Sequence, residues 1–213
     1  MFNFLFLPAF LIHHTITFGL SNWIKPKNTI SLSIISNSLV VSSGSYLFLN
    51  NYISKITMMN IFQFTLGFFA NEFLFKYYYN INKDRTLKII HHIIATIGIY
   101  KFQVRPELMT ILFFTEVTNI PLEIRNICKS YNYNRFYIQY VMISLLYVGF
   151  AYLRIYLAPV LSIQNYQRNN LSFTELNIFL GIYLLWIFWF YKINYIIYRK
   201  VKNYLHHKNP QIK

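Results

Sequence analysis

Long runs without a charged residue recur along this chain and constrain its fold more than any other feature. These runs cover 1–24, 28–54, 56–71, 136–153 and 176–191. Several of them reach or approach the ~20 apolar residues that a helix needs to cross a bilayer. Only 12% of the residues are charged, against about 25% in soluble domains. The sequence therefore predicts an all-α fold, a polytopic transmembrane helical bundle.

The apolar runs and the turns between them predict about seven spans. The expected helices are 3–23, 30–53, 58–79, 86–101, 107–127, 136–159 and 173–198. The fourth is short for a full crossing, and a polar turn ending in Pro106 joins it to the fifth. A re-entrant hairpin is therefore the alternative for this pair, provided that protein shields its backbone.

The distribution of Lys and Arg predicts an external N-terminus and a cytoplasmic C-terminus. With that orientation, the external loops hold only Lys55, Lys101, Arg105 and Arg168, and Arg154 lies within a span. The other fifteen of the 20 Lys and Arg residues fall on the cytoplasmic side, as the positive-inside rule requires. Removing the fourth span would spoil this agreement.

The same distribution argues against a nucleic-acid partner. The net charge is +14, but the basic residues lie between apolar runs and at the C-terminus, where membrane topology accounts for them. The single cysteine, Cys128, excludes an internal disulfide framework. The segment 1–23 lacks a basic start and a small-residue cleavage site, so we expect a retained span. Asn170 begins a glycosylation sequon on the expected external side.

Ionisable residues lie inside several of the apolar helices. Each such group costs roughly 2.5–3.5 kcal/mol at the bilayer centre, so it usually faces a protein interior or a wet cavity. The predicted intramembrane polar site consists of Glu72, His91, His92, Glu116, Asn119, Arg125 and Arg154. We expect His91, His92, Glu116 and Arg154 to face the bundle interior, whereas Trp23, Trp186 and Trp189 are expected at the membrane interfaces.

Two interpretations of this polar site remain open. In the first, the groups form interhelical hydrogen bonds and ion pairs that only hold the bundle together. In the second, His91 or His92, the candidate catalytic residues, perform acid–base chemistry on a lipid-like substrate. Adjacent helical residues point about 100° apart, so a metal site from this pair is not expected. No cofactor is predicted.

Three elements in order along the chain resemble the TLC domain, which unites translocating-chain-associated proteins, ceramide synthases and the neuronal ceroid lipofuscinosis group. They are the segment from Gly67 to Glu72, the double histidine His91-His92, and Glu116-Val-Thr-Asn119 followed by Arg125. Weaker similarities are Ser36, the segment from Tyr152 to Pro159, and the segment from Trp189 to Lys192. The resemblance covers roughly 30–200 and implies the helical fold of that family and a role in membrane lipid handling.

The chain departs from the family pattern at several positions. Glu72 stands where an Asp is usual, Glu123 stands where an Asn is common, and Ser38 lies near the place of a missing histidine. Ceramide synthases carry a further His-Asp block after the double histidine. Here no histidine follows His92 until His206, and no aspartate follows Asp84.

The resemblance thus implies a protein that influences membrane lipid composition, closer to small TLC-domain proteins than to the synthases, and more often a non-enzyme than an enzyme. The alternatives are an acyl-CoA-dependent N-acyltransferase of ceramide synthase type and a membrane cargo or translocation factor. We divide the chain into a first transmembrane helix with a basic loop (1–29), a TLC-like domain (30–200) and a basic cytoplasmic tail (201–213). Expected partners are membrane lipids, a second copy or other membrane proteins, in the endoplasmic reticulum or another cellular membrane.

Overall fold

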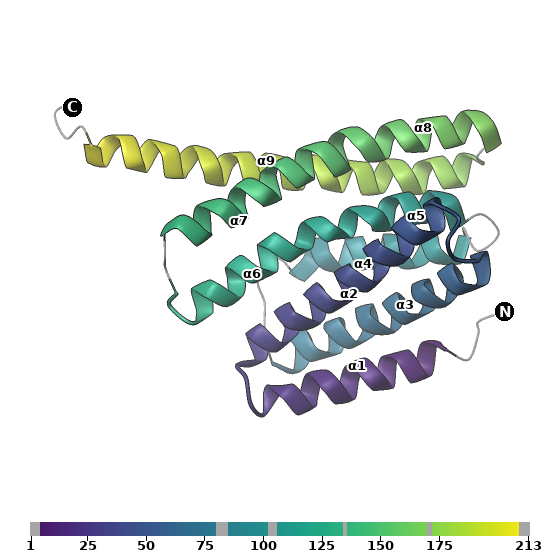
Figure 1. The fold of residues 1–213 in the computed structure, drawn as a ribbon, viewed down its shortest axis with the longest axis horizontal. Helices are drawn as coiled ribbons and strands as arrows, with labels where there is room; N and C mark the ends of the chain where they lie inside the picture. The colour runs from purple at the N-terminus through teal and green to yellow at the C-terminus, as the bar shows by residue number, and fades with distance from the viewer. Residues whose placement is uncertain (1–4, 80–84, 102–105, 134–135, 170–171, 209–213) are drawn as a thin grey trace.

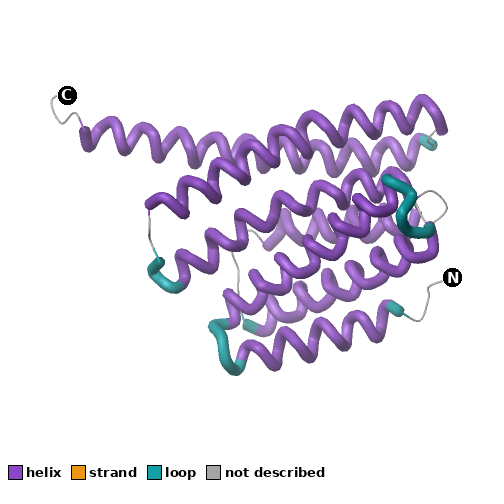
Figure 2. Tube along the Cα trace, in the orientation of Figure 1, coloured by secondary structure: helices purple, strands orange, loops and turns teal. Residues whose placement is uncertain are grey.

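The computed structural model describes residues 5–79, 85–101, 106–133, 136–169 and 172–208, and it is helical apart from short turns in these ranges (Figures 1 and 2). The helical segments are α1 (Phe6–Ser21), α2 (Pro26–Leu49), α3 (Lys55–Tyr78), α4 (Arg85–Lys101), α5 (Pro106–Phe114), the 3₁₀ segment η1 (Thr115–Thr118), α6 (Asn119–Ser130), α7 (Phe136–Gly149), the π-helical segment η2 (Phe150–Leu157), α8 (Ala158–Asn169) and α9 (Phe173–Lys208). The predicted all-α fold is confirmed.

Local sequence signals explain where three of the helices begin. Pro26 begins α2, where its missing N–H costs nothing. The Ser54 hydroxyl accepts a hydrogen bond from the Thr57 N–H and caps α3. Ser172 and Glu175 form a reciprocal capping box at the start of α9. As a result, α2 begins four residues before its expected start at 30, and α3 begins three residues before its expected start at 58.

The helices lie side by side in one bundle, with α1 and α9 at opposite edges, and α1 begins at the opposite end of the bundle from the end of α9 (Figure 1). The central α2 packs against α3, α5 and α6, while α1 packs mainly against α3. The contact between α1 and α3 depends on Gly67, because a Cβ there would lie 2.7 Å from the backbone N of Phe10. Gly98 similarly lets α4 approach Met109 of α5.

Two expected helices are irregular where they meet at the centre of the bundle. The expected helix 107–127 is built from α5, η1 and α6, and the 3₁₀ turn η1 comes just before Pro121. Pro121 has no N–H to donate and would clash with the preceding turn of a regular α-helix. The expected helix 136–159 continues to Asn169, and it contains the π-helical segment η2, which ends two residues before Pro159.

Three helical stretches among the described residues are long and apolar enough to cross a membrane. They are Pro26–Leu49, Tyr137–Gln167 and Phe173–Arg199, and two shorter apolar helices are Phe6–Ser21 and Ile90–Tyr100. The helix α3 carries Glu72 and Lys76, and the segment from α5 to α6 is broken by η1. Glu72, Glu116 and Asn119 thus come from segments that do not qualify as long apolar spans, whereas Arg154 lies in one that does.

Candidate functional site

A cavity of about 240 Å³ lies between α2, α3, α4, α6, α7, η2 and α9. All seven residues of the predicted polar site line it: Glu72, His91, His92, Glu116, Asn119, Arg125 and Arg154. These residues come from five helical segments spread over more than eighty positions of the sequence. The structure therefore brings the predicted polar residues together around one space.

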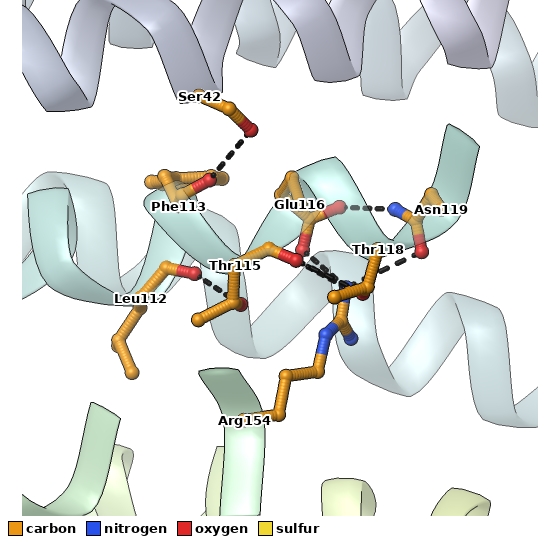
Figure 3. Close-up of polar contacts among 8 residues, drawn as sticks. All are labelled: Ser42, Leu112, Phe113, Thr115, Glu116, Thr118, Asn119 and Arg154. Atoms are coloured by element: carbon orange, nitrogen blue, oxygen red, sulfur yellow. Dashed lines mark hydrogen bonds and ion pairs between the residues drawn. The ribbon is translucent and has the colours of Figure 1, made fainter. Parts of the chain in front are cut away.

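An ion pair between Glu116 and Arg154 lies at the centre of the bundle (Figure 3). The Arg154 Nη2 is 3.3 Å from Glu116 Oε1 and donates to Asn119 Oδ1 at 3.2 Å. Asn119 in turn donates from Nδ2 to the other carboxylate oxygen of Glu116. Arg154 is 1% exposed and Glu116 9%, so the expectation that both face the interior is confirmed.

The irregular segments explain how this network forms. In η1 the Asn119 N–H donates to the Glu116 carbonyl instead of the Thr115 carbonyl. The Thr115 carbonyl oxygen accepts from the Thr118 hydroxyl at 2.9 Å and from Arg154 Nη2 at 3.4 Å. Arg154 itself projects from the π segment η2, and π turns are frequent at functional sites. The backbone irregularity and the ion pair therefore belong to one arrangement.

Aromatic rings complete the surroundings of the guanidinium. The Arg154 Cζ lies 5.0 Å from the Phe150 ring centroid and 5.4 Å from that of Trp186, within the range of cation–π attraction. The expectation that Trp186 lies at the membrane interface is wrong, because this side chain is 1% exposed. The Trp189 ring is partly buried and lies on the cavity wall beside His91.

The two histidines contact different helices. The His92 ring stacks on Phe69 of α3 with the centroids 4.3 Å apart, and its Nε2 lies 3.5 Å from Glu72 Oε2. Glu72 also forms an ion pair with Lys76 one turn later on α3. The His91 ring instead meets Trp189 of α9 edge to face, with centroids 5.2 Å apart. His92 therefore has a carboxylate, Glu72, beside it at the cavity.

Glu123 is a third buried carboxylate on the cavity wall, with 4% exposure. Its Oε2 accepts from the Ser31 hydroxyl of α2 at 2.6 Å and from Asn126 Nδ2 at 3.2 Å. The sequence indicated Glu123 only as a departure from the family pattern. Its position opposite Ser31 links α6 to α2.

Sequence reasoning missed Asn37 altogether. This side chain is 4% exposed, lines the cavity from α2, and its Oδ1 has no hydrogen-bond partner among the described residues. Several buried serines share α2 with it, so one more polar residue did not stand out. Lys192 of α9, noted only as part of a weak similarity, also lines the cavity.

The cavity thus combines paired charges with hydrogen-bonding groups that face an open space, and with apolar walls. Apolar side chains from α2, α3, α6, α7, η2 and α9 line the remaining surface: Ile34, Phe68, Phe69, Leu122, Ile143, Leu146, Phe150, Ile193, Ile196 and Ile197. Such a site suits an amphipathic molecule, whose polar part meets the charged groups and whose apolar part meets the isoleucines.

One protein-family model matches most of the chain. The model of the TLC domain, the family of TRAM, LAG1 and CLN8, matches residues 28–195. The chain belongs to the TLC-domain family. The match begins after α1 and includes every residue of the cavity wall up to Ile193. No curated protein and no solved structure matches the chain. Together with the apolar helices, the family points to a lipid-related membrane protein.

Proposed function

We propose that this TLC-domain protein is a multi-pass membrane protein that binds a lipid in its polar cavity and thereby influences membrane lipid composition. The observation that supports the proposal is the cavity itself. Protein interiors pack closely, with few voids larger than a water molecule, and a water occupies about 30 Å³ of liquid volume. A space of about 240 Å³ beside three buried carboxylates is therefore more than a packing defect.

The polar groups on the cavity wall also favour a binding role over a purely structural one. Some polar groups on the cavity wall have partners, as Arg154 Nη2 has in Glu116 and Asn119. Other polar groups, among them the Asn37 amide and the Arg125 guanidinium, line the open space and keep atoms without a partner among the described residues. Buried polar groups without a partner cost free energy, so a polar ligand that satisfies them would be stabilised there.

A second candidate function, an enzyme, rests on one specific contact. The His92 Nε2 lies 3.5 Å from Glu72 Oε2, and a carboxylate at this place can orient an imidazole and stabilise its protonated form. Acyl transfer to an amine would also need donors aimed at the developing oxyanion. The sequence lacks the His-Asp block that accompanies the double histidine in ceramide synthases, so lipid binding remains the preferred proposal.

Lipid analysis of cells tests the proposal. Cells expressing the wild type would be compared with cells expressing the His91→Ala/His92→Ala variant, each at matched protein level. We expect the membrane lipid composition to differ from that of non-expressing cells with the wild type and to return toward it with the variant. Unchanged composition with the wild type would refute the proposal.

Purified protein given a sphingoid base and an acyl-CoA separates the two candidates. Ceramide that is formed by the wild type and lost in the double-histidine variant would establish the enzyme instead. No product, combined with a histidine-dependent change in cellular lipids, is the result expected for a lipid-binding protein.

A further inference from the structure

We propose that the cavity recognises a phospholipid by its phosphate group, which binds to Arg125, while the acyl chains leave the bundle sideways between α7 and α9. This inference deepens the proposed function and rests on it. It names the chemical class of the lipid, the residue that selects it and the route by which it enters.

Arg125 is the first observation. Its side chain lines the cavity from α6 and is half-buried, and its Nε is buried with no hydrogen-bond partner among the described residues. None of the ion pairs in the described part of the chain involves it. A buried cation without an anion is costly, and the guanidinium fork matches the geometry of a phosphate.

The charges around the cavity favour an anion at this point. The ion pair with Glu116 occupies Arg154, and Glu72 pairs with Lys76 and His92. Glu123 remains as a carboxylate, held by Ser31 and Asn126. Two more cations, Arg125 of α6 and Lys192 of α9, also line the cavity. Of the two arginines on the cavity wall, Arg154 thus has a carboxylate partner among the described residues, whereas Arg125 has none.

The second observation is an apolar wall at the side of the cavity. Tyr147 and Phe150 both stack on Phe190, with centroids 5.5 and 6.1 Å apart, and so join the end of α7 to α9. Away from this contact the two helices diverge toward the C-terminal end of α9 (Figure 1). There Ile143 of α7 and Ile196 of α9 line the cavity, and Ile196 is 46% exposed.

Size decides how a lipid would fit. Sites that enclose a drug-sized ligand measure about 300–1,000 Å³, so a cavity of about 240 Å³ holds a headgroup but not two acyl chains. The chains must therefore lie outside it, and the isoleucines between α7 and α9 offer the apolar exit. A membrane lipid can enter by this route without leaving the bilayer.

Native mass spectrometry of the purified full-length protein in neutral detergent tests this assignment. The probes are dioleoyl phosphatidate, dioleoylglycerol (the same chains without the phosphate) and oleate (a carboxylate instead). The variants are Arg125→Gln, Arg125→Lys and Lys192→Gln. Arg199→Gln is the matched control, because Arg199 is exposed on α9 and lies outside the cavity wall.

We expect the wild type to bind phosphatidate more tightly than either other probe. Arg125→Gln should weaken this binding by about tenfold or more, the usual loss for a charged hydrogen-bonding group. The affinity of Arg125→Lys for phosphatidate should lie between those of the wild type and Arg125→Gln, because lysine keeps the charge but lacks the two-pronged guanidinium. Arg199→Gln should bind phosphatidate as the wild type does. If Arg125→Gln fails to elute as a monodisperse protein, Arg125→Lys and Lys192→Gln carry the comparison.

Phosphatidate binding that is unchanged in the Arg125 variants, or matched by dioleoylglycerol, would overturn the assignment. Oleate binding that depends on Arg125, without phosphatidate binding, would replace the phosphate by a carboxylate and overturn it as well. In these cases a lipid still binds and the proposed function stands. Failure of the wild type to bind any of the probes overturns this assignment, and the histidine-dependent lipid change in cells then decides the proposed function separately.

Discussion

At the scale of single residues, the buried polar groups of this protein form two linked centres around one cavity. Glu116, Asn119 and Arg154 form the inner centre, and Glu72 with His92 forms the second. In both, a carboxylate neutralises a cation or a titratable ring inside an apolar bundle. This pairing lowers the cost of placing charges at membrane depth.

Removing one member of the inner pair should therefore destabilise the protein strongly. Glu116→Ala leaves Arg154 buried and unpaired, a loss of about 3–5 kcal/mol in the free energy of unfolding. We expect a clear drop in the thermal midpoint of the protein in detergent, measured by size-exclusion chromatography after heating. Glu116→Leu combined with Arg154→Met should recover part of the loss, because no unpaired charge remains. A midpoint unchanged in Glu116→Ala would contradict a stabilising role for the pair.

The hydrogen bond between Ser31 and Glu123 gives a milder prediction. Ser31→Ala removes a 2.6 Å contact to a buried carboxylate and should cost about 1–3 kcal/mol of stability. Ser43→Ala is the matched control, because Ser43 lies exposed on the same helix. The same thermal measurement should separate the two variants. Equal midpoints would show that the Glu123 carboxylate does not depend on α2.

At the scale of elements, glycine positions set how closely the helices approach. A Cβ at Gly67 would lie 2.7 Å from the Phe10 N and 2.9 Å from the Ala9 carbonyl carbon, both backbone atoms of α1 that cannot turn aside. Gly67→Ala should therefore push α1 away and cost about 1–3 kcal/mol. Gly19→Ala, with nothing within 4 Å of its Cβ, should leave the thermal midpoint unchanged or raise it. The reverse order of the two midpoints would refute the close packing of α1 on α3.

Much of the element order was predictable from the sequence, because apolar runs and polar turns alternate clearly along the chain. The cavity residues were predictable for the same reason, since a Glu, Arg or His in an apolar run stands out. The 3₁₀ and π segments at Thr115–Thr118 and Phe150–Leu157 were not, since Arg154 of one segment contacts the Thr115 carbonyl of the other, a contact between distant parts of the sequence. Asn37 was missed because one more polar residue does not stand out in a serine-rich helix. The burial of Trp186 was missed because its helix carries many other aromatic residues.

At the scale of the whole molecule, α1 begins and α9 ends at opposite ends of the bundle (Figure 1), as an odd number of crossings requires. The basic residues in the segments 25–27, 83–88 and 125–135 and in the C-terminal tail favour the cytoplasmic side for these parts of the chain. These two features together support the seven-span proposal.

Tags at the two termini test this topology. In sealed microsomes, a C-terminal tag should be digested by added protease and an N-terminal tag should be protected. Detergent is the control that exposes both. A protected C-terminal tag would contradict the seven-span arrangement, and two digested tags would point to an even number of crossings.

The most direct test of the account is whether the cavity holds a lipid. Leu146→Trp places a bulky indole ring on the cavity wall, while Leu145→Trp places the same ring on the exposed face of α7. The lipid retained by each purified protein would be measured by mass spectrometry. We predict that the wild type and Leu145→Trp retain the same lipid, and that Leu146→Trp, still folded and monodisperse, loses it. Equal retention by Leu146→Trp would contradict the central claim that this cavity is the lipid site.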